Sequence, residues 1–96
     1  MKAQVDTQQS VPPPRDRICD LVLGILADPR ARRPLPMDVP LRELGMSSIK
    51  MVNLMLAVEA AFDITIPESE ITPENFVSIA AVENLVLRLI GARRVA

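Results

Sequence analysis

The sequence predicts an all-α protein, an antiparallel four-helix bundle with a long loop between helices 1 and 2 and a short third helix. Apolar residues recur at helical spacing in three separate segments, and proline-rich stretches separate the first two of them. No pair of alternating apolar segments is long enough to form strands. The chain has 96 residues, of which 49% are hydrophobic, and a net charge of −1, so it is expected to form one compact soluble domain.

The N-terminal part of the chain predicts an arm, one helix and a long loop. Residues 1–14 are polar and end in a run of three prolines, which indicates a flexible arm. From Arg15 the apolar residues follow the spacing of one helical face until Asp28-Pro29 ends the helix; they are Ile18, Leu21, Val22 and Ile25. The loop 29–47 is held to the core by a short turn carrying Leu41 and Leu44. Loops of this length usually serve a function.

The second helix is predicted from Ser48 to Phe62 and has two apolar faces. Ser47 is a good N-cap, and Gly45 just before it allows backbone conformations that other residues rarely adopt. The core face is formed by Met51, Leu54, Met55, Val58 and Phe62. The other face carries Ile49, Val52, Leu56 and Ala60. Because a small bundle cannot bury both faces, apolar surface is expected to stay exposed beside Ser48.

The C-terminal part predicts a short helix and a long one. Ile64–Pro67 is an extended link, and Thr72 caps a short third helix that begins at Pro73 and runs to about Val77. Ser78 caps the last helix, which Gly91 is predicted to end before a basic tail at residues 92–96. Its core face is formed by Ile79, Val82, Leu85, Val86, Leu89 and Ile90.

The composition argues against an enzyme. The chain has no His, Trp or Tyr, and its single cysteine, Cys19, lacks an imidazole that would activate it, so Cys19 is interpreted as a packing residue. No His or Cys cluster exists to hold a metal. The near-neutral charge predicts no nucleic-acid partner, and no apolar run is long enough to cross a membrane or to form a signal peptide. The expected location is cytoplasmic.

The most informative motif is Leu44-Gly45-Met46-Ser47-Ser48-Ile49, which places a serine on the first turn of a helix. Unpaired N–H groups and the helix dipole favour an anion there. The motif resembles the Leu-Gly-x-Asp-Ser-Leu signature of acyl and peptidyl carrier proteins, and the order of elements from about Leu41 to Ile90 is similar to theirs. The resemblance implies that residues 15–91 form a carrier domain and that Ser48 bears a covalent 4′-phosphopantetheine, which holds an acyl or aminoacyl group as a thioester.

The sequence departs from the family pattern at two places, and both affect which partner enzymes the chain is expected to bind. The usual aspartate is replaced by Ser47, which keeps the cap but loses a charge that the modifying transferase often uses. The second helix is also poor in acids: Glu59 alone remains, and Lys50, Asn53, Ala60 and Ala61 stand where acids are frequent. Docking on general fatty-acid enzymes is therefore disfavoured.

Ser-Ser together with residues 54–64 looks more like free-standing carriers that receive amino acids from dedicated ligases. A monomer is expected. The implied partners are a phosphopantetheinyl transferase, an acyl- or aminoacyl-activating ligase and downstream acyl-transferring enzymes. The cargo stays open between fatty acyl, polyketide and amino acid.

The exposed apolar face supports a second hypothesis. Five residues are candidates for partner contact: Met46, Ile49, Val52, Leu56 and Glu59. The alternative to a carrier is an unmodified helical interaction module that grips a protein through Ile49, Val52 and Leu56. Two charged groups are interpreted as solvated surface or, alternatively, as contacts for a partner; they are Glu68, Glu70 and Glu74, and Arg30, Arg32 and Arg33.

Overall fold

The computed structural model describes residues 13–28 and 35–95, and every regular element within them is helical. Three are α-helices: α2 (Pro14–Leu26), α3 (Ser48–Phe62) and α4 (Ile79–Val95). Three are short 3-10 turns: η1 (Leu41–Leu44), η2 (Glu68–Glu70) and η3 (Pro73–Phe76). The predicted all-α class is therefore confirmed for the described residues.

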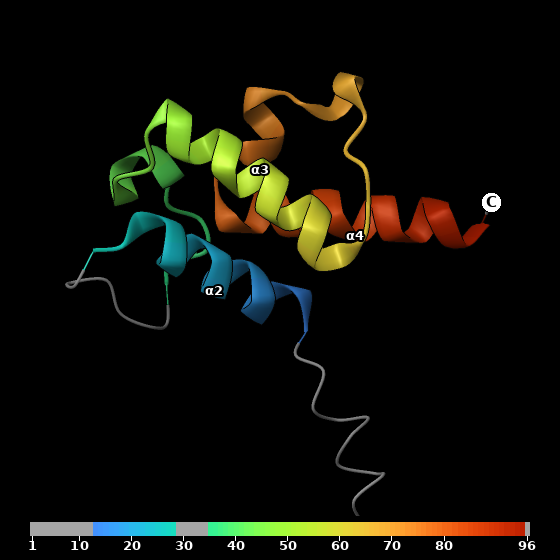
Figure 1. The fold of residues 1–96 in the computed structure, drawn as a ribbon, viewed down its shortest axis with the longest axis horizontal. Coiled ribbons are helices and arrows are strands. Elements are labelled where there is room, and N and C mark those ends of the chain that lie inside the picture. Colours follow the sequence, from blue (N-terminus) through green and yellow to red (C-terminus); the bar gives the residue numbers. More distant parts are fainter. Residues whose placement is uncertain (1–12, 29–34, 96) are drawn as a thin grey trace, which may run out of the picture.

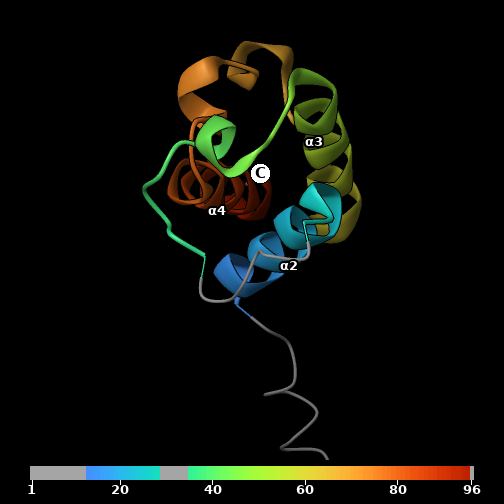
Figure 2. The same ribbon diagram turned by 90° about the vertical axis from the view of Figure 1, so that its left-hand side faces the viewer.

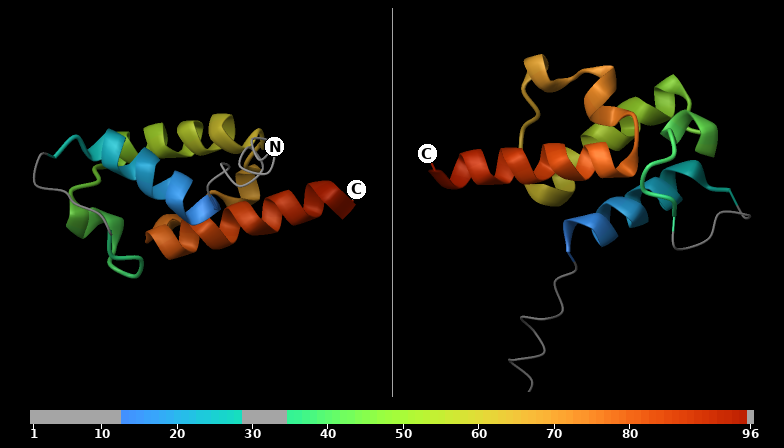
Figure 3. Two further views of the ribbon diagram at one scale, coloured as in Figure 1. Left: turned by 90° about the horizontal axis from the view of Figure 1, so that it is seen from below. Right: turned by 180° about the vertical axis from the view of Figure 1, so that it is seen from behind.

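α2 packs against both α3 and α4 (Figures 1 and 3). Figure 1 shows that α2 runs opposite to α3, whereas α3 and α4 run in the same direction. The connection from Asp63 to Ser78 therefore crosses the molecule, and its turn η3 packs against α4 (Figure 2). The bundle is thus not uniformly antiparallel.

The core is formed where the apolar faces of the three α-helices meet. In α3, Leu54 and Val58 are completely buried and Phe62 nearly so, while Met51 and Met55 are half-buried. Cys19 is buried against the same core, which confirms its interpretation as a packing residue. The remaining buried apolar residues are Ile18, Val22, Leu26, Leu35, Leu41, Met46, Ile64, Ile66, Phe76, Ile79, Val82, Leu85 and Val86.

Backbone hydrogen bonds join the two long connections to each other and attach the first of them to α4. The Leu41 N–H donates to Val77 O at 2.8 Å, and the Ala80 N–H donates to Met37 O at 3.0 Å. Asp63 adopts a left-handed conformation (φ 53°) that ends α3, and Ile64 and Ile66 then point into the core on either side of exposed Thr65. This segment forms the extended link that the sequence predicts.

The structure shows where three of the predicted helices end. The last helix does not stop at Gly91, because α4 continues to Val95; Ala92, Arg93 and Arg94 are good helix formers, and a glycine alone does not end a helix. The predicted short third helix is a single 3-10 turn, which begins at Pro73 as expected and ends at Phe76, one residue before Val77. The first helix ends at Leu26, three residues before Pro29, and Ala27 after it adopts a left-handed conformation with φ 52°.

Parts of the sequence predictions lie outside the described residues. These are the arm up to residue 12 and the loop cations Arg30, Arg32 and Arg33. Among the helices that are described, none is long and apolar enough to cross a membrane. Within the same residues, no group of three or more His, Cys, Asp or Glu side chains is placed to hold a metal ion.

Candidate functional site

Ser48 is the first residue of α3 and its side chain is exposed. Ser47 is the N-cap, as predicted: its Oγ accepts a hydrogen bond from the Lys50 N–H at 3.2 Å, and its carbonyl accepts one from the Met51 N–H at 2.8 Å. Gly45 precedes it with φ 101°, a left-handed conformation that favours glycine and ends η1. The local sequence thus presents the Ser48 hydroxyl at the positive end of a 15-residue helix.

An open pocket of about 540 Å³ lies beside the serine pair. Ser47 and Ser48 are among its lining residues, with Met51 and Met55 of α3 on the same side. The segment 71–77, which includes η3, forms the opposite wall. The two methionines are half-buried because they face this pocket. Its volume falls within the range of roughly 300–1,000 Å³ that is usual for small-molecule sites.

The second apolar face of α3 is exposed, as the two-face argument predicts. The exposed fractions are 77% for Ile49, 48% for Val52 and 59% for Leu56. Met46 does not belong to this face: only 4% of it is exposed, so its placement among the exposed partner residues is wrong. Met46 follows the left-handed Gly45 and precedes α3, and its buried side chain belongs to the core and also lines the pocket.

The charged groups of α3 are engaged within the molecule. Lys50 Nζ donates to the Leu26 carbonyl at 3.3 Å and so satisfies the end of α2, where carbonyls lack helical partners. Glu59 is half-buried, and its Oε2 accepts the Ile66 N–H at 2.8 Å, which holds the link after α3. Both side chains therefore have structural partners, and the exposed face of α3 is mainly apolar.

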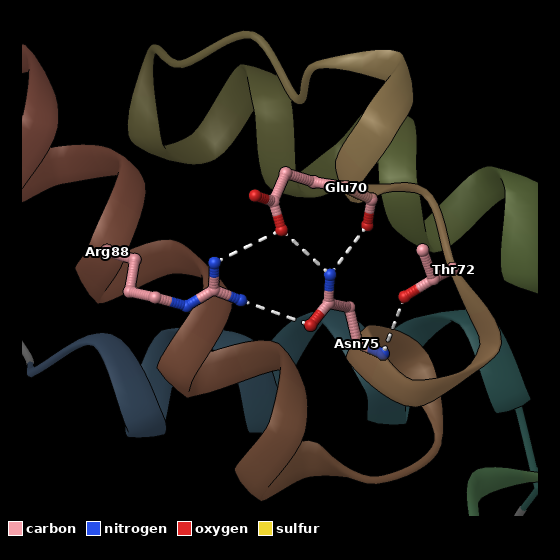
Figure 4. Close-up of polar contacts among 4 residues, drawn as sticks. All are labelled: Glu70, Thr72, Asn75 and Arg88. Carbon is pink, nitrogen blue, oxygen red and sulfur yellow. Dashed lines mark hydrogen bonds and ion pairs between the residues drawn. The ribbon is translucent and has the colours of Figure 1, made fainter.

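Glu70 differs from the other two acids of its group. Glu68 and Glu74 are exposed, whereas Glu70 Oε1 accepts hydrogen bonds from Arg88 Nη1 at 3.1 Å and Asn75 Nδ2 at 3.0 Å. Arg88 Nη2 also donates to Asn75 Oδ1 at 3.1 Å (Figure 4). The hydrogen bonds from Arg88 and then Asn75 hold the pKa of the Glu70 carboxyl below its usual range.

Sequence reasoning did not identify the far side of the pocket. Ile71 and Val77 are exposed at 47% and 49%, and both line it. Arg42 of η1 is the charged side chain among the lining residues. The sequence does show that Ile71 and Val77 flank a short capped turn, which could have marked them as an apolar surface. No local pattern, however, indicates that residues 71–77 lie against the start of α3.

Comparison with known proteins gives one consistent result. Residues 16–86 match the family model described as a phosphopantetheine attachment site. The chain is 49% identical over 73 residues to aminoacyl carrier protein 1 of Bradyrhizobium diazoefficiens, covering 76% of this chain and 81% of that protein. It is 38% identical over 78 residues to aminoacyl carrier protein 2 of the same organism, covering 81% and 88%.

A solved structure is similar in fold as well as in sequence. It is a chain in the crystal structure of the Bradyrhizobium japonicum glycine:[carrier protein] ligase complexed with glycylated carrier protein. The TM-score is 0.62 at 49% identity, and the match covers 74% of this chain and 96% of that chain.

Proposed function

The chain belongs to the phosphopantetheine-binding carrier proteins, and on that basis we propose that Ser48 bears the 4′-phosphopantetheine arm. The observation that carries the proposal is the exposed Ser48 hydroxyl at the N-terminus of α3, beside an open pocket. A phosphodiester at this position would be stabilised by the helix dipole and by the N–H groups of the first turn. When attached, the arm supplies a thiol that holds an acyl group as a thioester.

We propose an aminoacyl group as the cargo, in a specialised carrier of the free-standing kind. The support comes from relatives named aminoacyl carrier proteins, which the chain matches over 81% and 88% of their length. The similar solved structure is of a carrier that is glycylated. Glycine is therefore the first amino acid to test.

The exposed face of Ile49, Val52 and Leu56 is the proposed docking surface for the partner enzymes. Lys50 and Glu59 are held by intramolecular hydrogen bonds, so the apolar side chains are the groups that this helix can offer to a partner. The partners are a phosphopantetheinyl transferase first, an aminoacyl-activating ligase second and acyl-transferring enzymes last. Catalysis of each step belongs to these enzymes.

We extend the proposal to the finer assignments of the fold. The turn η3 takes the place of the short third helix of the carrier-type four-helix bundle, and residues 15–91 form the carrier domain of a monomer. Packing of η3 against α4 supports the first assignment.

Intact mass spectrometry tests the function directly. The protein is incubated with coenzyme A and a broad-specificity phosphopantetheinyl transferase, and then with glycine, ATP and an aminoacyl-carrier ligase. We expect one phosphopantetheine and then one glycyl group per chain. A chain that gains no phosphopantetheine would instead be the unmodified interaction module, for which the exposed apolar face of α3 is the supporting observation.

A further inference from the structure

The wall of the pocket opposite Ser48 is fastened to α4 by a network of polar side chains. Glu70 precedes the segment 71–77 and Asn75 lies within it, and Arg88 reaches both from α4 (Figure 4). Asn75 Nδ2 also donates to the backbone carbonyl of Glu70 at 2.8 Å, and the Asn75 N–H donates to Thr72 Oγ1 at 3.3 Å. One arginine therefore binds the chain at two points, one before and one after the exposed Ile71.

The network lies on the side of the segment 71–77 that faces α4, whereas the pocket lies on the side that faces α3. The pocket lies between α3 and the segment 71–77, whereas Arg88 binds the segment from α4. Phe76, buried to 5% exposure, anchors the same segment to the core. Arg88 and Glu70 are partly exposed, at 52% and 31% of their side chains, so the contact can open without unfolding the core. Opening it would release Ile71 and Thr72, which line the pocket.

We propose that Arg88 is a positioning residue, which holds the segment 71–77 through Glu70 and Asn75 as a fixed wall and so keeps the arm on Ser48 lying along the pocket. This inference rests on the proposed attachment at Ser48. The wall has the apolar side chains Ile71 and Val77 at the pocket surface, and an arm lying against them shields its thiol from solvent. A loosened wall exposes the thiol for a larger fraction of the time.

The variants are Arg88→Ala, Glu70→Ala and the double variant, with Arg15→Ala as the matched control. Arg15 forms an ion pair with Glu83 of α4 at 3.5 Å, and neither residue lines the pocket. The control thus removes one arginine contact to α4 without touching the wall. Because Arg88 and Glu70 act in one network, the double variant is expected to behave like Arg88→Ala rather than as the sum of two effects.

Two measurements on the full chain distinguish the mobility of the pocket wall from the accessibility of the arm thiol. Amide hydrogen exchange of residues 70–77 in the apo protein is expected to rise about two- to fivefold in Arg88→Ala, the size of a lost surface ion pair, and to stay unchanged in Arg15→Ala. In the holo protein, alkylation of the arm thiol by iodoacetamide is expected to accelerate by the same factor. The apo protein, whose single thiol is Cys19, supplies the background rate.

Each outcome bears on one step. Equal exchange in Arg88→Ala and Arg15→Ala would overturn the network as a fastening of the wall. Faster exchange without faster alkylation would overturn the link from the wall to the arm. Absence of any phosphopantetheine on the wild-type chain would overturn the proposed function and this inference with it.

Discussion

Replacing Leu56 by glutamate tests whether α3 has a docking face that is separate from the core. Leu56 is 59% exposed, and glutamate has nearly the helix propensity of leucine, so the free energy of unfolding is expected to change by no more than about 0.5 kcal/mol. For a domain of this size, that change corresponds to a shift in Tm of about 2–4 °C. An apolar anchor at the centre of an interface is worth about 2 kcal/mol, which predicts a loss of about 30-fold in kcat/KM for loading by the ligase.

The assay is ligase-catalysed aminoacylation of the holo protein, with thermal unfolding followed in parallel. Leu87→Glu is the matched control, because Leu87 is 48% exposed but lies on α4. It receives the same chemical change and is expected to load at the wild-type rate. A large loss of Tm in Leu56→Glu would show that Leu56 is a core residue, and equal loading of the two variants would refute the docking face.

Three further predictions concern stability and titration. Leu54→Ala and Leu85→Ala each remove a completely buried side chain and are expected to cost about 2–5 kcal/mol in urea unfolding; an unchanged unfolding midpoint would refute the core assignment. Ser47→Ala loses the N-cap hydrogen bond to α3 and is expected to cost about 0.5–2 kcal/mol and to slow modification without abolishing it, as followed by intact mass. The lowered pKa of Glu70 means that its ion pair stabilises the fold above the ordinary carboxyl pKa and loses this contribution as the pH falls through the lowered value. In a carbon-13 NMR titration, Arg88→Ala should raise the Glu70 pKa toward its ordinary value, while the hydrogen bond from Asn75 continues to lower it; an unchanged pKa would contradict the network.

The helices were predictable because their signals are local. The spacing of Leu54, Val58 and Phe62 determines the buried face of α3, and Ser47 caps the helix through a backbone N–H three residues away. The same spacing places Ile49, Val52 and Leu56 outside the buried face, and all three are exposed in the structure. Periodicity within one helix is thus enough to separate a core face from a free face when the helix is apolar on both.

The parts that were not predicted depend on contacts between distant segments. The sequence groups Met46 with the exposed apolar face of Ile49, Val52 and Leu56, but Met46 follows the left-handed Gly45, outside the helix, and is buried. Arg88 binds Glu70 across a sequence separation of 18 residues, and no pattern in either segment indicates the other. The pocket combines residues 40–55 with residues 71–77, so it becomes visible only once the connection after α3 has crossed the molecule.

Locating the phosphopantetheine on the chain tests directly whether Ser48 is the attachment site. The wild-type protein, Ser48→Ala and Ser47→Ala are each treated with coenzyme A and a broad-specificity phosphopantetheinyl transferase, and the products are analysed by intact mass and by fragmentation of the peptide that contains both serines. We expect one phosphopantetheine on Ser48 in the wild type and in Ser47→Ala, and none in Ser48→Ala. Modification of Ser48→Ala, or fragments that place the group on Ser47, would contradict the assignment of Ser48 as the attachment site.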